Sequence, residues 1–165
     1  MSSVVVRQAR RTQYSLLMAR VRPGWLVALC ALIVAVSAWF PWLTSAVDGG
    51  GRANAIGGIA GAMLVPPPGF GVGQFIVLLT SLLVVAGAMS ARDISARMAS
   101  TAALSISVIL VVLAVWYYRL YVYPPVSAGY GLYIGGAFAL AAVLLSVWTM
   151  LAAWRSPAPV TMRHS

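Results

Sequence analysis

The sequence predicts an all-α integral membrane protein, an antiparallel bundle of four transmembrane helices built of two helical hairpins. Hydrophobic residues make up 62% of the 165 residues and charged residues only 8%, whereas about a quarter of a soluble domain is charged. So few charges cannot cover a water-facing surface, and lipid is therefore the expected solvent. We interpret residues 1–165 as a single membrane domain.

Four apolar stretches are long enough to cross a bilayer, which takes roughly 20 helical residues. The predicted spans are 24–44, 73–90, 99–121 and 130–154. No polar segment between them is long enough to fold separately. Within the glycine-rich first loop, residues 53–65 are expected to lie as a short helix on the membrane surface.

The arginines predict the orientation, because positive residues favour the cytoplasmic side of a membrane helix. Nine of the eleven fall before the first span, between the second and third, or after the fourth. Only Arg52, in the first connection, and Arg119, near the end of the third span, lie on the opposite side. We therefore expect a multi-pass protein of the cell membrane with both termini in the cytoplasm. Residues 1–23 form a basic arm and residues 155–165 a tail.

A short internal sequence repeat suggests how the two hairpins are related. Pro68 precedes Gly69-Phe70-Gly71 at the second span, and Pro125 precedes Gly129-Tyr130-Gly131 at the fourth. Two hairpins of equal orientation would be related by an axis along the membrane normal. Gene duplication and convergence explain this repeat about equally well.

The fourth span begins with a ladder of small residues on one helix face: Gly131, Gly135 and Ala139, widened by Gly136. Burial of apolar area does not drive helices together in lipid, so close backbone approach has to supply the attraction. We expect this ladder to pack inside the bundle; a contact with another protein is the alternative.

Two arginines on the expected outer side are candidate contacts for an anion or a lipid headgroup. Arg119 follows an unbroken apolar run and should extend its guanidinium toward the headgroups. Arg52 follows Asp48 and three glycines, whose backbone amides are able to cradle an anion. Anchoring of the helix and a solvated turn are the favoured interpretations of these two positions.

The sequence offers no set of residues for chemistry. Neither acid lies inside a predicted span, His164 lies in the tail, and the single cysteine, Cys30, is surrounded by apolar residues. We therefore expect no enzyme activity, no metal and no cofactor. The net charge of +9 is assigned to membrane topology, so nucleic acid is not an expected partner.

The motif Trp39-Phe40-Pro41-Trp42, with Gly129-Tyr130-Gly131 at the last span, resembles a broad group of uncharacterised actinobacterial four-helix membrane proteins. The resemblance covers the layout of most of the chain. It implies a small envelope membrane protein with an aromatic outer face, and it carries over no catalytic residues.

The leading expectation is a non-catalytic accessory subunit that associates with a larger membrane complex or with copies of itself. Its predicted contact is an outer aromatic rim of Trp39, Trp42, Trp116 and Tyr117, because tryptophan and tyrosine are favoured anchors at interfaces. The alternatives are a small transporter or channel component, an outer-face lipid-binding protein, and an enzyme acting on lipid-linked substrates.

Cysteine labelling tests the predicted orientation. In a Cys30→Ser background, Ser127→Cys should react with a membrane-impermeant thiol reagent in intact cells. Ser95→Cys should react only after the membrane is permeabilised, because its connection is cytoplasmic. Labelling of position 95 from outside would reverse the orientation.

Overall fold

A computed structural model describes residues 23–61, 71–92 and 94–155, without the side chain of Asp48. Most of the predicted basic arm and of the tail lies outside these residues. The elements in chain order are α2 (Pro23–Ser37), β1 (Pro41–Ser45), a 3-10 turn (Val47–Gly49), β2 (Gly51–Asn54), β3 (Ile59–Gly61), α3 (Val72–Ala91), α4 (Ala96–Tyr121), β4 (Val126–Ala128) and α5 (Tyr130–Arg155). The described chain is mostly helical, as predicted.

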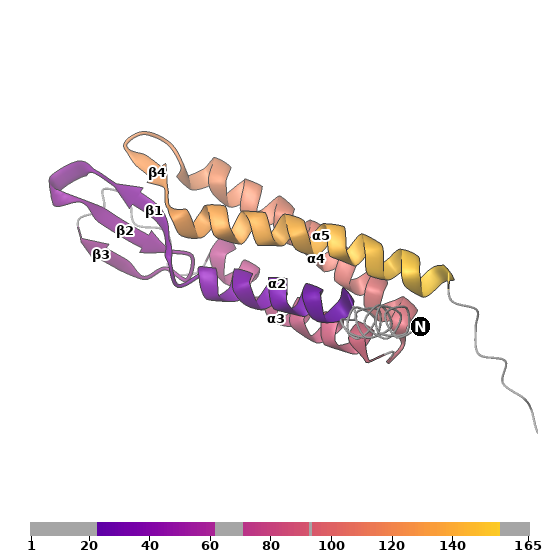
Figure 1. Cartoon of the computed structure of the whole chain (residues 1–165). Coiled ribbons are helices and arrows are strands. Elements are labelled where there is room, and N and C mark those ends of the chain that lie inside the picture. Colours follow the sequence, from indigo (N-terminus) through magenta and orange to yellow (C-terminus); the bar gives the residue numbers. More distant parts are fainter. Residues whose placement is uncertain (1–22, 62–70, 93, 156–165) are drawn as a thin grey trace, which may run out of the picture.

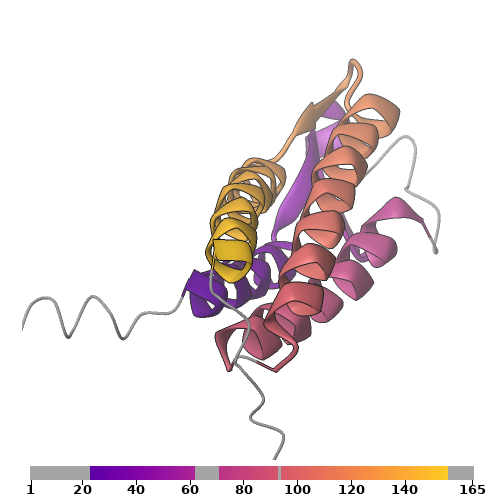
Figure 2. The same ribbon diagram turned by 90° about the vertical axis from the view of Figure 1, so that its right-hand side faces the viewer.

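The four described helices form a bundle in which neighbours run antiparallel (Figure 1). Helix α2 packs against α3 and α5, and α4 packs against the same two helices. Viewed from its end, the bundle therefore has α2 and α4 on one diagonal, and all four helices surround a shared interior (Figure 2). The predicted antiparallel bundle is confirmed in the described residues.

Small residues fill the interior at alternating steps of three and four positions. On α5 the buried positions that follow this spacing are Leu132, Gly135, Ala139, Ala142, Ser146 and Thr149. This spacing averages 3.5 residues and keeps one helix face against its neighbours. Large apolar side chains such as Leu78, Val112 and Leu144 are exposed instead. The surface of the bundle is therefore as apolar as its interior.

By length and composition, α3, α4 and α5 are able to cross a membrane, and α2 is a shorter apolar helix. The predicted first span, 24–44, extends too far, because α2 ends at Ser37. The next three amides bond carbonyls three residues back, and Pro41 then follows. Proline disfavours helical backbone at the residue before it. The chain therefore leaves the helix and continues as β1.

A four-stranded antiparallel sheet lies at one end of the bundle, which we call the sheet end (Figure 1). Its strand order is β3-β2-β1-β4, and β4 comes from the connection between α4 and α5. The sheet corrects the all-α prediction. It also corrects the predicted surface helix at 53–65 over residues 53–61, since Ala53 and Asn54 end β2 and Ile59–Gly61 forms β3; residues 62–65 lie outside the described residues.

The two faces of the sheet differ in character. Leu43 is aligned with Ala53 and Ala128 on the neighbouring strands, and Leu43 and Ala53 are buried. Thr44 is aligned with Arg52 and Ser127. Successive side chains on a strand point to opposite faces. One face therefore joins the core, and the other presents Arg52, Thr44 and Ser127 in a row.

At the end opposite the sheet, α2 and α3 touch backbone to backbone. A Cβ added to Gly24 would lie 2.6 Å from the amide nitrogen of Ala91 and 2.7 Å from the carbonyl oxygen of Gly87. A Cβ added to Gly87 would lie 2.9 Å from the amide nitrogen of Ala28. Gly24-x3-Ala28 and Gly87-x3-Ala91 are thus paired small-residue motifs of the kind that bring membrane helices close together.

We predict that Gly24→Ala destabilises the bundle. The added methyl meets backbone, which cannot move aside alone, and such overpacking typically costs about 1–3 kcal/mol. Gly136→Ala is the matched control, because its Cβ would meet no atom within 4 Å and alanine favours helix by up to about 1 kcal/mol. Thermal unfolding in detergent measures both. Equal melting temperatures for the two variants would contradict the close contact.

Candidate functional site

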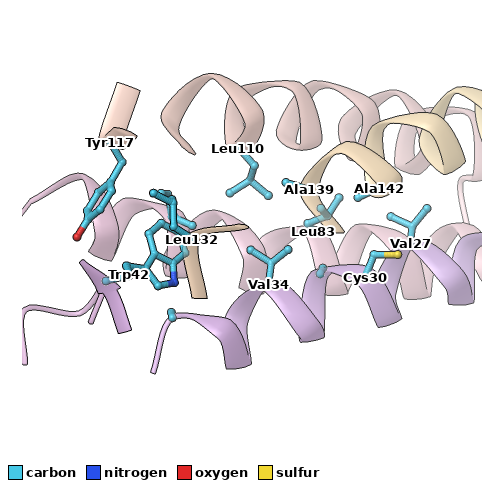
Figure 3. Packing of buried hydrophobic residues seen from close by; sticks show 14 of the residues in the cluster. Val27, Cys30, Val34, Trp42, Leu83, Leu110, Tyr117, Leu132, Ala139 and Ala142 are labelled. Atoms are coloured by element: carbon cyan, nitrogen blue, oxygen red, sulfur yellow. The ribbon is translucent and has the colours of Figure 1, made fainter. Parts of the chain in front are cut away.

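Trp42 joins the sheet to the bundle. Its side chain is fully buried, and its indole Nε1 donates a hydrogen bond to the carbonyl oxygen of Ser37 at 2.8 Å. The ring meets Tyr117 edge-on, with 5.1 Å between ring centroids, and Tyr117 lies 4.7 Å from Tyr121. Figure 3 shows Trp42 and Tyr117 at one end of the apolar interior. A residue of β1 thus closes the core where α2 has already ended.

The small-residue ladder of α5 makes room for this ring. A Cβ on Gly131 would lie 2.7 Å from Cδ1 of Trp42, and one on Gly135 would lie 3.0 Å from its Cζ2. Ala139 is buried one turn further on. Gly136 faces open space instead. The structure therefore places Gly131, Gly135 and Ala139 inside this chain's own bundle and Gly136 at its surface.

Backbone hydrogen bonds tie the sheet to α5 and α2 as well. The amide of Gly129, just before α5, donates to the carbonyl oxygen of Trp42 at 2.8 Å. The amide of Ala55, just after β2, donates to the carbonyl oxygen of Ala38 at 3.1 Å. Both bonds join residues at an end of a strand to residues at an end of a helix. The sheet is thereby held at two corners of the bundle.

Helix α3 holds the third corner. The Gln74 side-chain amide donates to the carbonyl oxygen of Ile56 at 2.7 Å, while its oxygen accepts from the amide of Gly71 at 2.7 Å. Gly73 lies against the carbonyl of Ala55, where a side chain would not fit. With Tyr117 of α4 packed on Trp42, all four helices contact the sheet or the turn after β2. The sheet is therefore a fixed platform.

The predicted aromatic rim is not a single surface. Trp42 and Tyr117 lie in the interior, because the chain turns into β1 where a helix was predicted. Trp39 and Trp116 are 63% and 58% exposed. The prediction that Trp42 and Tyr117 lie on the rim is therefore wrong, and a partner contact through Trp39 and Trp116 stays a prediction.

The two arginines proposed as anion contacts lie on separate elements of the sheet end. Arg52 is exposed on the outward face of β2, next to Thr44, whose hydroxyl reaches the carbonyl oxygen of Ser127 at 3.4 Å. Arg119 is exposed in the last turn of α4. It lies two residues after the buried Tyr117, which places it on the outward side of the helix. The structure does not bring the two guanidinium groups into one site.

Four buried hydroxyl groups bond to their own helices. The hydroxyls of Thr80, Ser100, Ser107 and Thr149 donate to carbonyls three or four residues earlier. The buried hydroxyls of Ser146 and Tyr117 have no hydrogen-bond partner among the described residues. In the described part of the chain, no group of three metal-binding side chains occurs.

Comparison with known proteins gives no relative. No family model matches the chain, and no curated protein or solved structure matches it. The resemblance to actinobacterial four-helix proteins therefore stays a prediction. The candidate site is defined by this structure alone, as the exposed face of the sheet and the joint beneath it.

The sequence does not predict the position of Trp42 at the site, because Pro41–Ser45 has no alternating pattern that would indicate a strand. At the opposite end of the bundle, the contact between Gly24 and Gly87 does have a sequence signal, a small residue four positions after each glycine.

Tyr117 provides a test of the joint, because its buried hydroxyl has no hydrogen-bond partner among the described residues. An unsatisfied buried polar group costs about 1–3 kcal/mol, so Tyr117→Phe should leave the melting temperature unchanged or raise it. Tyr117→Ala removes the ring beneath the sheet and should cost about 3–5 kcal/mol. A clear loss of stability in Tyr117→Phe would reveal a bound partner of the hydroxyl.

Proposed function

We propose that the protein is a non-catalytic accessory subunit of the cell membrane, in which a four-helix anchor holds a small sheet as a docking platform. The observation that carries this proposal is that all four helices contact the sheet or the turn after β2, while Arg52 and Ser127 on the other face of the sheet are exposed among the described residues. A loop that only linked two helices would not need such attachment. A fixed, exposed face suits binding of another membrane protein.

Exposed aromatic side chains at both ends of the bundle support its placement across the membrane. Aromatic side chains are exposed at the sheet end, including Phe40, Tyr130 and Tyr133, and at the opposite end, including Trp25 and Trp154. Amphipathic rings of this kind settle at headgroup level. Their presence at both ends of the bundle favours two belts at headgroup level.

The orientation in this proposal puts the sheet outside the cell. In the described residues, Arg92, Arg97 and Arg155 lie at the end away from the sheet, whereas Arg52 and Arg119 lie at the sheet end. The undescribed terminal segments add six arginines next to α2 and α5. The positive-inside rule therefore favours cytoplasmic termini.

The platform offers two kinds of contact to a partner. The row of Arg52, Thr44 and Ser127 supplies a cation and two hydroxyls on a rigid surface. Strand β3 occupies an end position of the sheet, and all three of its residues are exposed. Strands at such positions are able to pair with an extended segment of another chain. The expected partner thus presents an acidic or extended segment outside the membrane.

A small transporter or channel component is the second candidate, and an outer-face lipid-binding protein is the third. A transport path usually has charged or polar groups at mid-depth that face it. Here the buried hydroxyls of Thr80, Ser100, Ser107 and Thr149 bond to their own helices, and Gly24 and Gly87 bring the backbones of α2 and α3 into contact. These features support the docking role over transport through a single chain.

Site-specific photocrosslinking in intact cells tests the docking role. A photoreactive residue at Ser127, on the exposed face of β4, should yield one discrete protein adduct. The same residue at Leu144, which is 73% exposed on the lipid-facing side of α5, is the control and should yield none. The adduct at position 127 should weaken with Arg52→Glu, which reverses the charge of the platform.

Two outcomes of the crosslinking experiment would contradict the docking role. Recovery of the protein without an adduct at position 127, together with solute flux in reconstituted vesicles, would move the assignment to a transporter. An adduct only with a second copy would make the platform a homo-oligomer contact.

A further inference from the structure

The sheet ends on both sides in a short strand with an outward-facing edge. Its strand order is β3-β2-β1-β4, so β3 and β4 are the end strands of the described sheet. All three residues of β3 are exposed, and in β4 Ser127 is exposed and Ala128 is partly exposed. End strands of natural sheets commonly carry a charge or a proline that hinders pairing with another chain. Ile59–Gly61 and Val126–Ala128 carry neither.

The register of β1 and β4 determines which backbone groups of β4 face outward. The amide of Gly129 donates to the carbonyl oxygen of Trp42 at 2.8 Å, and Thr44 is aligned with Ser127 two residues away from that bond. Hydrogen-bonded and non-hydrogen-bonded pairs alternate along antiparallel strands. Thr44 and Ser127 therefore form a hydrogen-bonded pair, and Ala128 turns its N–H and its carbonyl toward the outer edge.

The same alternation applies to β2 and β3. The amide of Asn54 donates to the carbonyl oxygen of Gly58 at 3.0 Å, so Ala60, two residues further along, also bonds to β2. Ile59 lies between them and turns its N–H and its carbonyl toward the outer edge of β3. Both edges thus present an outward-facing donor and acceptor on one residue, which is what an added antiparallel strand requires.

The directions of the two end strands match as well. Strand β1 leaves the bundle just after α2, and β4 returns to the bundle just before α5. Because neighbouring strands are antiparallel, β3 runs away from the bundle and β4 runs toward it (Figure 1). In two copies with the same orientation in a membrane, β4 of one copy is therefore antiparallel to β3 of the other. Antiparallel pairing of β4 with β4 would require an inverted copy.

The sheet also specifies the register of such a contact. One row of aligned residues crosses all four strands and consists of Ala60, Arg52, Thr44 and Ser127. Placing Ser127 opposite Ala60 of the next copy continues this row, so that both copies lie at a similar depth in the membrane. It also brings Ala128 opposite Ile59, whose apolar side chain is 44% exposed. The outward-facing backbone groups of the two edges then meet.

We propose that copies of the protein associate edge to edge in the membrane, with β4 of one copy paired to β3 of the next. The N–H and carbonyl of Ala128 exchange hydrogen bonds with those of Ile59, and the Ile59 side chain packs beside Ala128. Because sheets twist, each copy is turned relative to the previous one, and such head-to-tail contacts close into a ring or continue as a chain. The inference rests on the membrane placement proposed above. It repeats the outward row of Arg52, Thr44 and Ser127, so that a docked partner meets several platforms at once.

Disulfide trapping in the full-length protein tests the contact. Ala60 and Ser127 form a non-hydrogen-bonded pair in this register, and the side chains of such pairs lie close enough for a disulfide. In a Cys30→Ser background, Ala60→Cys with Ser127→Cys should yield covalent oligomers in oxidised cells, which a reductant returns to the monomer. Two differently tagged copies, one with Ala60→Cys and the other with Ser127→Cys, should yield only mixed dimers when they are co-expressed.

The matched control moves one cysteine by a single residue. Ala60→Cys with Ala128→Cys places the two thiols on opposite faces of the sheet, so it should yield no disulfide. Ala128→Pro removes the outward N–H without removing a hydrogen bond to β1. It should weaken self-association in mild detergent about fivefold, the effect of one hydrogen bond. Ile59→Pro removes the corresponding donor of β3 and serves if Ala128→Pro fails to fold.

Three results would overturn the proposal. The first is a protein that is monomeric in mild detergent and yields no disulfide with Ala60→Cys and Ser127→Cys. The second is an equal disulfide yield with Ala60→Cys and Ala128→Cys, which would indicate random collision. The third is a disulfide-linked dimer of either single-cysteine variant alone, which would indicate a symmetric contact.

The edge contact and the docking role fail separately. Ala128→Pro weakens the edge contact and leaves Arg52, Thr44 and Ser127 on the outward face. An adduct of another protein at position 127 in this variant would support the docking role without self-association. Covalent oligomers without such an adduct would support the edge contact alone.

Discussion

The burial of the Trp42 indole is the constraint on which the rest of the structure depends. Its nitrogen needs an acceptor when it is taken out of water, and Ser37 at the end of α2 supplies one. Its ring needs space, and Gly131 and Gly135 supply it. Tyr117 covers the remaining edge. A residue of the sheet thus contacts the end of α2, the start of α5 and the inward side of α4.

The two ends of the bundle solve the packing problem by different means. At the sheet end, a large ring fills the space between helices that small residues leave open. At the opposite end, Gly24 and Gly87 let the backbones of α2 and α3 touch directly. The packing at both ends depends on glycine. In lipid, helices attract each other through close approach of their backbones and not through removal of apolar area from water.

The sequence predicted the helical part of the fold well and the sheet not at all. Long apolar runs are a strong sequence signal for membrane helices. The predicted ends of the second, third and fourth spans therefore lie within about three residues of the observed ends of α3, α4 and α5. The sheet has short strands, and β1 pairs with β4 across 83 residues of chain at Thr44 and Ser127. No local pattern encodes such a partner. For the same reason the sequence predicts Trp42 and Tyr117 on an exposed rim, whereas both are buried.

The pairing of β1 with β4 also has a consequence for biosynthesis. Strands β1, β2 and β3 leave the ribosome early and are able to form their hairpins while the helices that follow are still being made. The second edge of β1 stays open until Val126–Ala128 has been translated. Completion of the sheet therefore waits for the synthesis of α4. A nascent chain stalled before that point would expose an unpaired edge of β1.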